Sequence, residues 1–366
     1  MEAYLQRAKE YCLQKTRENC KEFTTCFPTP QSENYWYGKT GCTDWTESFW
    51  TGILWLSYEM SGEEIFAETA RAQLPLFAER IQKRINTDTH DLGFLYTLSC
   101  VAAYKLIGDR EARETALAAA DCLLERFHEK GGFLQAWGSL DDRNNYRLII
   151  DCLMNLPLLF WAYEETGKEV YRDRAVSHLK ATLKTIVRED GSTYHTFFFD
   201  PETGDPERGE THQGFSDDSC WARGQAWGIY GLAICYRYTK LEEIIPLWEK
   251  VTEYFVRHLP EDDVPYWDLC FTEGDEPRDT SSAAIAVCGI MEMNQLVPET
   301  GYREAGERMM KSLALHYTTQ GMVSNGLLKD GMYGRPRGDR SECNIWGDYF
   351  FMEALLRSEK TWKPYW

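Results

Sequence analysis

The chain has 366 residues, of which 43% are hydrophobic and 27% are charged, so it can form one large globular domain or two ordinary ones. Its formal net charge of −18 argues against nucleic acid and anionic membrane surfaces as partners. No apolar stretch reaches the roughly 18 residues of a membrane span, and the sequence does not open on a secretory leader. We therefore expect a cytoplasmic protein.

The predicted elements are nearly all helices, and they come in pairs. Each pair has an apolar helix, a short turn and an amphipathic helix; Ser61–Glu64 and Thr300–Glu304 are two of the turns. Glycine in such a turn ends one helix, and the acids favour the start of the next. In chain order, helices are expected near residues 3–19, 44–60, 62–84, 91–107, 109–128, 150–165, 168–188, 220–238, 241–258, 279–296, 301–317 and 344–358. Strand-like alternation is confined to residues 193–199 and the region around Tyr266-Trp267-Asp268.

The spacing of the apolar helices predicts a closed ring. Their starts lie 47 to 70 residues apart, and two helices per repeat indicate a solenoid or a ring. An open superhelix would expose helices that are apolar on all sides. The first helix has no inner partner before it, and the helix at 344–358 has no outer partner after it, so these two can complete a sixth hairpin. We predict an all-α fold, a six-hairpin (α/α)6 toroid, as one domain over residues 1–366.

Five long irregular segments are expected to gather on one face of this ring. Each runs from an outer helix to the next inner helix, so together they lie at the N-terminal ends of the inner helices. Loops of this length in a compact domain are usually functional. The segments are residues 21–43, 129–148, 189–219, 259–278 and 318–343.

Two aspartates at the start of apolar runs are the leading catalytic candidates. Asp91 and Asp151 have no Lys or Arg in the first turns of their runs, so each carboxylate would be buried without a local partner. They are 60 residues apart, about one repeat, which places them at equivalent heights on adjacent inner helices. Two carboxylates across a pocket are typical of glycoside cleavage. We expect one to stay protonated near neutral pH and the other to be ionised; the alternative is that both are helix N-caps.

The other candidates have simple structural alternatives. Asp44 and Asp279 are expected to be N-caps. Arg223 can bind a substrate carboxylate in bidentate fashion, or it can form a structural ion pair with Asp217 or Asp218. The 13 Trp and 21 Tyr can hold sugar rings or fill an aromatic-rich core.

A metal site is not expected. The histidines His90, His195 and His212 have no i,i+4 pair of the kind that helical metal sites use. The twelve cysteines are scattered and read as free thiols of a reducing compartment. Cys20, Cys26 and Cys42 lie closer together and are a minor candidate for metal ligands.

Several stretches resemble the unsaturated glucuronyl hydrolases of glycoside hydrolase family 88. The resemblance runs nearly from end to end, and the matching segments occur in the same order. They are Asp44-Trp45-Thr46, residues 49–55, His90-Asp91-Leu92-Gly93-Phe94, Gln135-Ala136-Trp137-Gly138, residues 149–159, Tyr194-His195-Thr196, Thr211-His212-Gln213-Gly214, residues 221–230 and Ile345-Trp346-Gly347-Asp348-Tyr349.

The resemblance implies the same toroid and a particular reaction. The substrate would be a small anionic oligosaccharide, an unsaturated disaccharide whose terminal uronate carries a C4=C5 double bond. Asp151 would protonate C4 and take a proton from the water that adds at C5, while Asp91 would hold ring hydroxyls and tune its partner. The resulting hemiketal would open and release the second sugar. The resemblance implies no metal or organic cofactor.

The resemblance also implies a set of substrate-binding residues. The family pattern places Trp45, His90, His195, Gln213, Trp221, Arg223 and Trp227 around the unsaturated uronate, with Trp137 and Tyr333 at the next sugar. Some members that act on sulfated fragments carry a Ser-x-x-Ser-x-Lys pattern in the last loop. Residues 324–343 lack this pattern and offer Lys329, Arg335, Arg337 and Arg340 instead.

Other readings remain open at this point. An unsaturated rhamnogalacturonyl hydrolase would share the fold and the chemistry. An inverting glycosidase, an epimerase and a non-enzymatic helical scaffold are further alternatives. The protein is expected to be a monomer or a homodimer.

Overall fold

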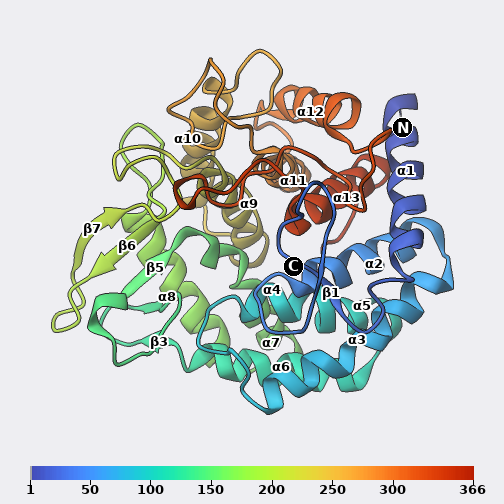
Figure 1. The fold of residues 1–366 in the computed structure, drawn as a ribbon. Helices are drawn as coiled ribbons and strands as arrows, with labels where there is room; N and C mark the ends of the chain where they lie inside the picture. The colour runs from blue at the N-terminus through green and yellow to red at the C-terminus, as the bar shows by residue number, and fades with distance from the viewer. Residues whose placement is uncertain (1) are drawn as a thin grey trace.

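The computed structural model describes residues 2–366, and its helices form a ring (Figure 1). One inner helix is composite, because a π-helical turn, η1 (Thr97–Val101), joins α4 (Leu92–Tyr96) to α5 (Ala102–Ile107). The other helices are α1 (Ala3–Asn19), α2 (Glu47–Ser61), α3 (Glu64–Gln82), α6 (Arg110–Leu124), α7 (Pro157–Thr166), α8 (Glu169–Thr185), α9 (Ala222–Thr239), α10 (Ile244–Arg257), α11 (Thr280–Leu296), α12 (Arg303–Ser312) and α13 (Ile345–Glu359).

The inner helices close on themselves. Contacts run from α2 to α4, from α4 to α7, and on through α9, α11 and α13 back to α2. The remaining helices lie outside them (Figure 1). Helix α1 packs against α13 and completes the sixth hairpin, so the six-hairpin toroid predicted from the sequence is confirmed within residues 2–366.

Burial explains which helices lie inside. Nearly every residue of α9, α11 and α13 is buried, whereas the outer helices bury one face. Small residues let the inner helices approach closely: a Cβ on Gly289 of α11 would lie 2.7 Å from the Cα of Tyr230 on α9. Removal of this much apolar surface from water, at about 25 cal/mol per Å², is the main force that closes the ring.

The predicted turns and loops lie where the sequence placed them. Helices α2, α5 and α7 end at left-handed glycines, Gly62, Gly108 and Gly167. The long loops meet at the N-terminal ends of the inner helices, where isolated bridges join Thr89 to Trp137 and Trp221 to Asp268. Among the described residues, no helix is both long and apolar enough to cross a bilayer. The twelve cysteines are free thiols.

Two predicted helix starts were wrong. The helix expected from residue 150 is a 3₁₀ turn, η3 (Ile150–Met154), followed by α7 from Pro157. Proline fits the first turn of a helix and disrupts its interior, so the α-helix cannot run through from residue 150. Helix α2 starts at Glu47, and Asp44 is not its N-cap; the Asp44 carboxylate instead accepts from the Trp45 backbone.

Short strands support the loop face. Strands β5 (Arg147–Ile149), β6 (Thr196–Phe199) and β7 (Pro206–Glu210) form an antiparallel sheet in that order. Part of the predicted strand at 193–199 is thus confirmed, but the region around Tyr266 forms only isolated bridges. Two further antiparallel pairs are β1 (Phe27–Pro28) with β2 (Lys39–Thr40) and β3 (Phe127–His128) with β4 (Phe133–Leu134).

Candidate active site

The structure brings Asp91 and Asp151 together around His90. The His90 Nε2 atom lies 3.5 Å from Asp91 Oδ1 and 3.4 Å from Asp151 Oδ1. Both carboxylates are mostly buried, with side-chain exposures of 14% and 18%, and His90 is completely buried. Within residues 2–366, neither His90 ring nitrogen nor Asp151 Oδ1 has a hydrogen-bond partner. All three atoms are buried, and an unpaired buried polar group is costly, so this cluster is a candidate functional site.

Local backbone structure holds each aspartate in place. Asp91 occupies the N-cap position of α4, but its side chain does not cap the helix. It accepts instead from Thr89 Oγ1, over 2.7 Å. Asp151 lies in the 3₁₀ turn η3, at the end of strand β5, where the Ile150 amide donates to the His195 carbonyl. The N-cap alternative for these two residues is therefore wrong.

The two carboxyl groups differ in their affinity for a proton. Burial raises the pKa of Asp91 to about 6, although the Thr89 hydrogen bond and the charge of Arg80 oppose this. Burial raises the pKa of Asp151 well above its usual range, and the negative charge of Asp91 raises it further. At neutral pH, Asp91 is therefore the ionised member of the pair and Asp151 the protonated one.

His90 stays neutral between them. Burial lowers its pKa to about 3, with Arg126 and Arg147 contributing through their positive charges. Its contacts with the carboxylates are therefore not ion pairs. A neutral imidazole can donate or accept one hydrogen bond at each ring nitrogen, so His90 can bind a polar ligand without adding charge.

Aromatic rings form the wall beside the aspartates. The Trp45 indole stacks on Trp346 at 5.2 Å and lies 5.8 Å from Phe94, which follows Asp91 by three residues. Its Nε1 donates to the Tyr333 hydroxyl over 3.0 Å. Trp45 and Tyr333 are both half-buried, so they retain a face for a ligand.

A second group of predicted residues lies on the next loops. The Nδ1 atom of His195 accepts from the backbone amides of His212 and Gln213, at 2.9 and 3.3 Å. Burial lowers the pKa of His195 well below its usual range, so the ring is neutral and carries its proton on Nε2. The His195 ring lies 4.4 Å from Trp221, the residue before α9. The Gln213 side chain donates to the Tyr333 carbonyl over 2.7 Å.

Arg223 has a structural partner that the sequence did not reveal. Its guanidinium is 1% exposed and pairs with Asp279 at 3.0 Å, so the predicted partners Asp217 and Asp218 were wrong. It also donates to the Met332 and Tyr333 carbonyls. Asp279 is the N-cap of α11, as predicted, and accepts from the Ser281 amide. Arg223 therefore fixes the last loop, and its positive charge partly opposes the rise that burial causes in the pKa of Asp151.

Trp137 and Trp227 lie in different settings. Trp137 is half-buried, with the Arg147 guanidinium 4.6 Å from its ring. Trp227 is 1% exposed and packs against Phe94 at 5.3 Å, one turn along α9 from Arg223. The site thus unites all the predicted residues at one end of the ring, with Trp227 beneath its surface.

Sequence reasoning missed several supporting residues. Thr89 precedes Asp91 by two residues, a spacing typical of local side-chain hydrogen bonds, so it could have been found. Arg126 follows α6 and Arg147 opens strand β5; both depress the pKa of His90 through their charges, but they are distant from it in sequence and left no local signal.

The same trio can geometrically hold a metal ion. Ligand atoms of His90, Asp91 and Asp151 all lie within 4.8 Å of one another. No other group of three or more such ligands was found in residues 2–366, so Cys20, Cys26 and Cys42 do not form one. A reaction that uses both carboxylates for proton transfer and sugar binding would need this space for substrate.

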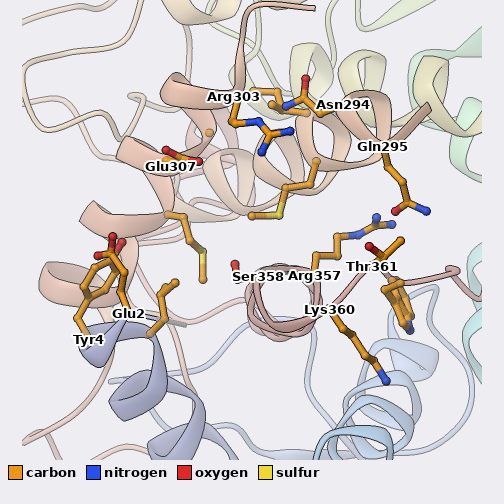
Figure 2. A pocket seen from close by; sticks show the side chains of 16 residues that line it. Glu2, Tyr4, Asn294, Gln295, Arg303, Glu307, Arg357, Ser358, Lys360 and Thr361 are labelled. Carbon is orange, nitrogen blue, oxygen red and sulfur yellow. The ribbon is translucent and has the colours of Figure 1, made fainter. Parts of the chain in front are cut away.

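A separate hollow lies at the other end of the ring. It has a volume of about 730 Å³ and is lined by the C-terminal ends of α11 and α13, including Asn294 and Ser358 (Figure 2). Arg303 and Glu307 of α12 face it from the outer layer. It contains none of the predicted site residues.

Comparisons with known proteins identify the family and the fold. The model of Glycosyl Hydrolase Family 88 matches residues 15–361. The chain is 49% identical to the unsaturated chondroitin disaccharide hydrolase of Streptococcus pneumoniae, over 98% of this chain and 93% of that one. Its structure matches the unsaturated glucuronyl hydrolase of Streptococcus agalactiae with a TM-score of 0.98 and 48% identity, over 100% of this chain and 94% of that one.

A further solved structure holds a ligand. A mutant of the Streptococcus agalactiae hydrolase, complexed with dGlcA-GalNAc6S, is 44% identical and matches with a TM-score of 0.88, over 99% of this chain and 93% of that one. The relatives do not favour the rhamnogalacturonyl alternative or the scaffold. With its fold and nearly its whole length matched, the chain belongs to glycoside hydrolase family 88.

Proposed function

We propose that the protein is an unsaturated glucuronyl hydrolase that hydrates the C4=C5 double bond of a terminal unsaturated glucuronate. The observation that carries this proposal is the pair of buried carboxyl groups on either side of neutral His90, one protonated and one ionised at neutral pH. A vinyl ether needs an acid that remains protonated at working pH and a negative charge to stabilise the cation that forms.

In the proposed mechanism, Asp151 supplies and recovers the proton. Its carboxyl group transfers a proton to C4, and positive charge develops at C5 and the ring oxygen. A water molecule then adds at C5 and gives a proton to the Asp151 carboxylate, which restores the acid. The hemiketal then opens: the bond between C5 and the ring oxygen breaks, C5 becomes a ketone, and the ring oxygen takes a proton and stays on C1 as a hydroxyl. C1 is now an open-chain hemiacetal, which becomes an aldehyde as the second sugar leaves as an alcohol. No cofactor enters this balance.

The neighbouring groups orient the sugar. Asp91 is ionised and can accept hydrogen bonds from ring hydroxyls. Its negative charge also raises the pKa of Asp151. We propose that His90, His195 and Gln213 contact the uronate, with Trp45 and Trp221 against its ring. Arg223 is already bound by Asp279 and two carbonyls. Its effect on the substrate carboxylate would therefore be mainly one of charge and of loop position.

The substrate class follows from the relatives and from the last loop. We propose an unsaturated chondroitin disaccharide, because the relatives named above act on or bind this class. The guanidinium of Arg337 lies 4.5 Å above the Tyr333 ring and is exposed, so it can meet an anionic group on the second sugar. Trp137 and Tyr333 are proposed to contact that sugar. We also propose that the enzyme acts in the cytoplasm as a monomer or a homodimer.

One assay tests the function. The double bond of unsaturated disaccharides absorbs ultraviolet light, and hydration removes this absorbance. Purified protein should lower the ultraviolet absorbance of unsaturated chondroitin, hyaluronan, heparin or gellan fragments. The absorbance of chondroitin disaccharides should fall fastest. Unchanged absorbance on all of them would overturn the proposal.

A further inference from the structure

Asn155 is a buried polar residue that links the two aspartate-bearing turns. It follows η3 and is completely buried. Its Oδ1 accepts from the Phe94 amide in α4 over 2.7 Å, and its Nδ2 donates to the Asp151 carbonyl over 3.2 Å. The backbone N–H of Phe94 needs an acceptor and the carbonyl of Asp151 needs a donor, so the two contacts fix which way the amide faces.

The backbones of the two turns also meet at this point. A Cβ placed on Gly93 would lie 2.3 Å from Asn155 Cα and 2.4 Å from Asn155 O. Only glycine fits at that contact, so the start of α4 and the end of η3 touch directly. The pair Gly93 and Asn155 therefore leaves little freedom for Asp91, two residues before the glycine, to move relative to Asp151.

We infer that Asn155 is a positioning residue of the active site, which sets the separation and relative orientation of the Asp91 and Asp151 carboxyl groups. This inference rests on the proposed function. Neither aspartate is held to the other by a direct hydrogen bond, and Asp151 Oδ1 has no partner within the described residues. The fixed geometry must therefore come from the backbone, and Asn155 is the side chain that bonds to both backbones.

The amide also affects the charge of the pair. As a hydrogen-bond donor, Asn155 lowers the pKa of Asp91 and so favours its ionised form. The charged and titratable groups that also face the pair are Arg80 of α3, Arg126, Arg223 of α9, Asp44, His90 and the thiol of Cys152. Replacing the amide with a carboxyl removes the donor while it keeps the acceptor for Phe94.

The Asn155→Asp variant therefore separates positioning from folding. The Phe94 hydrogen bond survives, but an added carboxyl now faces Asp151 O and Asp91. We expect kcat on an unsaturated disaccharide to fall about 100-fold, with KM changed by about threefold or less, because a small misplacement of catalytic groups has an effect of this size. The acid limb of the pH–rate profile should move to higher pH by about one unit. Asp91 loses a hydrogen-bond donor and gains a like-charged neighbour, and both changes raise its pKa.

Two more variants keep the test decisive. Asn155→Ala removes both bonds without adding charge, so it should lose rate with a smaller shift of the acid limb. The control is Asn294→Asp, which places a carboxyl at a buried asparagine near the C-terminal end of α11, at the end of the ring away from the aspartates. It should leave kcat and the pH profile unchanged.

The outcomes are distinct. If wild type is active but folded Asn155→Asp or Asn155→Ala retains wild-type kcat and pH profile, Asn155 is merely structural and the inference is wrong. If wild type itself does not act on any unsaturated disaccharide, the proposed function fails instead.

Discussion

Two groups of buried carboxylates, one at each end of the ring, are held in opposite ways. At the far end, Glu353 and Glu292 are completely buried and are paired with Arg357 at 2.9 and 2.8 Å. Glu353 also accepts from Tyr349 and Trp366, both over 2.9 Å, so its oxygens are satisfied. At the loop end, Asp91 and Asp151 have no Arg or Lys within salt-bridge distance in residues 2–366.

The difference teaches which buried charges hold the fold and which are available for chemistry. A paired network loses free energy when one member is removed, because an uncompensated buried charge is left behind. An unpaired buried carboxylate instead destabilises the folded state, and its burial raises the pKa of the carboxyl group. Asp91 and Asp151 fall in the second class, as expected for groups that act on a substrate.

The largest expected effect is on turnover. Asp151→Asn removes the only proposed proton donor, so kcat should fall by roughly 10³-fold or more. The melting temperature should not fall, because no ion pair is lost. The matched control is Asp141→Asn, on an exposed loop, which should keep full activity. Substantial activity in the Asp151 variant would remove this residue from its assigned role.

The far end should show the reverse pattern. Glu353→Gln leaves Arg357 buried with one partner fewer, and should lower the free energy of unfolding by roughly 3 to 5 kcal/mol. Activity per folded molecule should stay within about twofold of wild type. As a control, Glu79→Gln breaks an exposed pair with Lys83 and should cost about 1 kcal/mol or less. Denaturant unfolding and active-site kinetics on the same samples would check both; a stable but inactive Glu353 variant would break the comparison.

A smaller effect concerns pH and stability. The pKa of Asp91 is raised from 3.8 to about 6, so its protonated form contributes stability that is fully present below about pH 4 and is lost as the pH rises through 6. The Asp91→Asn variant does not lose this stability, because an amide does not ionise. It should be more stable than wild type by roughly 1 to 3 kcal/mol at pH 8 and should lose this advantage near pH 4. Unfolding curves at the two pH values test the sign, and an advantage that grows toward acid would contradict it.

The smallest effect should be that of metal removal. Because proton transfer is assigned to side chains and water alone, dialysis against EDTA should leave kcat and KM unchanged. A loss of activity that zinc or magnesium restores would show that the cluster of His90, Asp91 and Asp151 works as a metal site instead.

Much of this architecture was predictable from regular patterns. A closed ring could be predicted from three features of the sequence. Some helices are apolar on all sides, amphipathic helices alternate with them, and glycine occurs at the turns. The spacing of Asp91 and Asp151 by one repeat was enough to place them side by side. Both arguments depend on periodicity, which a single sequence displays directly.

The remaining details depend on contacts between distant segments. Helix α7 begins at Pro157, which leaves Asp151 outside the α-helix, in a 3₁₀ turn. The sequence does show this proline, but the apolar run around it favoured one continuous helix. The pairing of Arg223 with Asp279 joins residues 56 positions apart, and a nearby Asp217 or Asp218 was the simpler choice. No local pattern distinguishes these partners, because only the closed ring brings α9 and α11 together.

The most direct test of the central claim follows the double bond in heavy water. Proton NMR during turnover of an unsaturated chondroitin disaccharide in D₂O should show one deuterium entering C4 in a single configuration. The vinyl proton signal should disappear at the same rate as the second sugar is released. If the second sugar is instead released while the uronate still carries its double bond, the enzyme cleaves the glycosidic bond directly and the hydration mechanism is wrong.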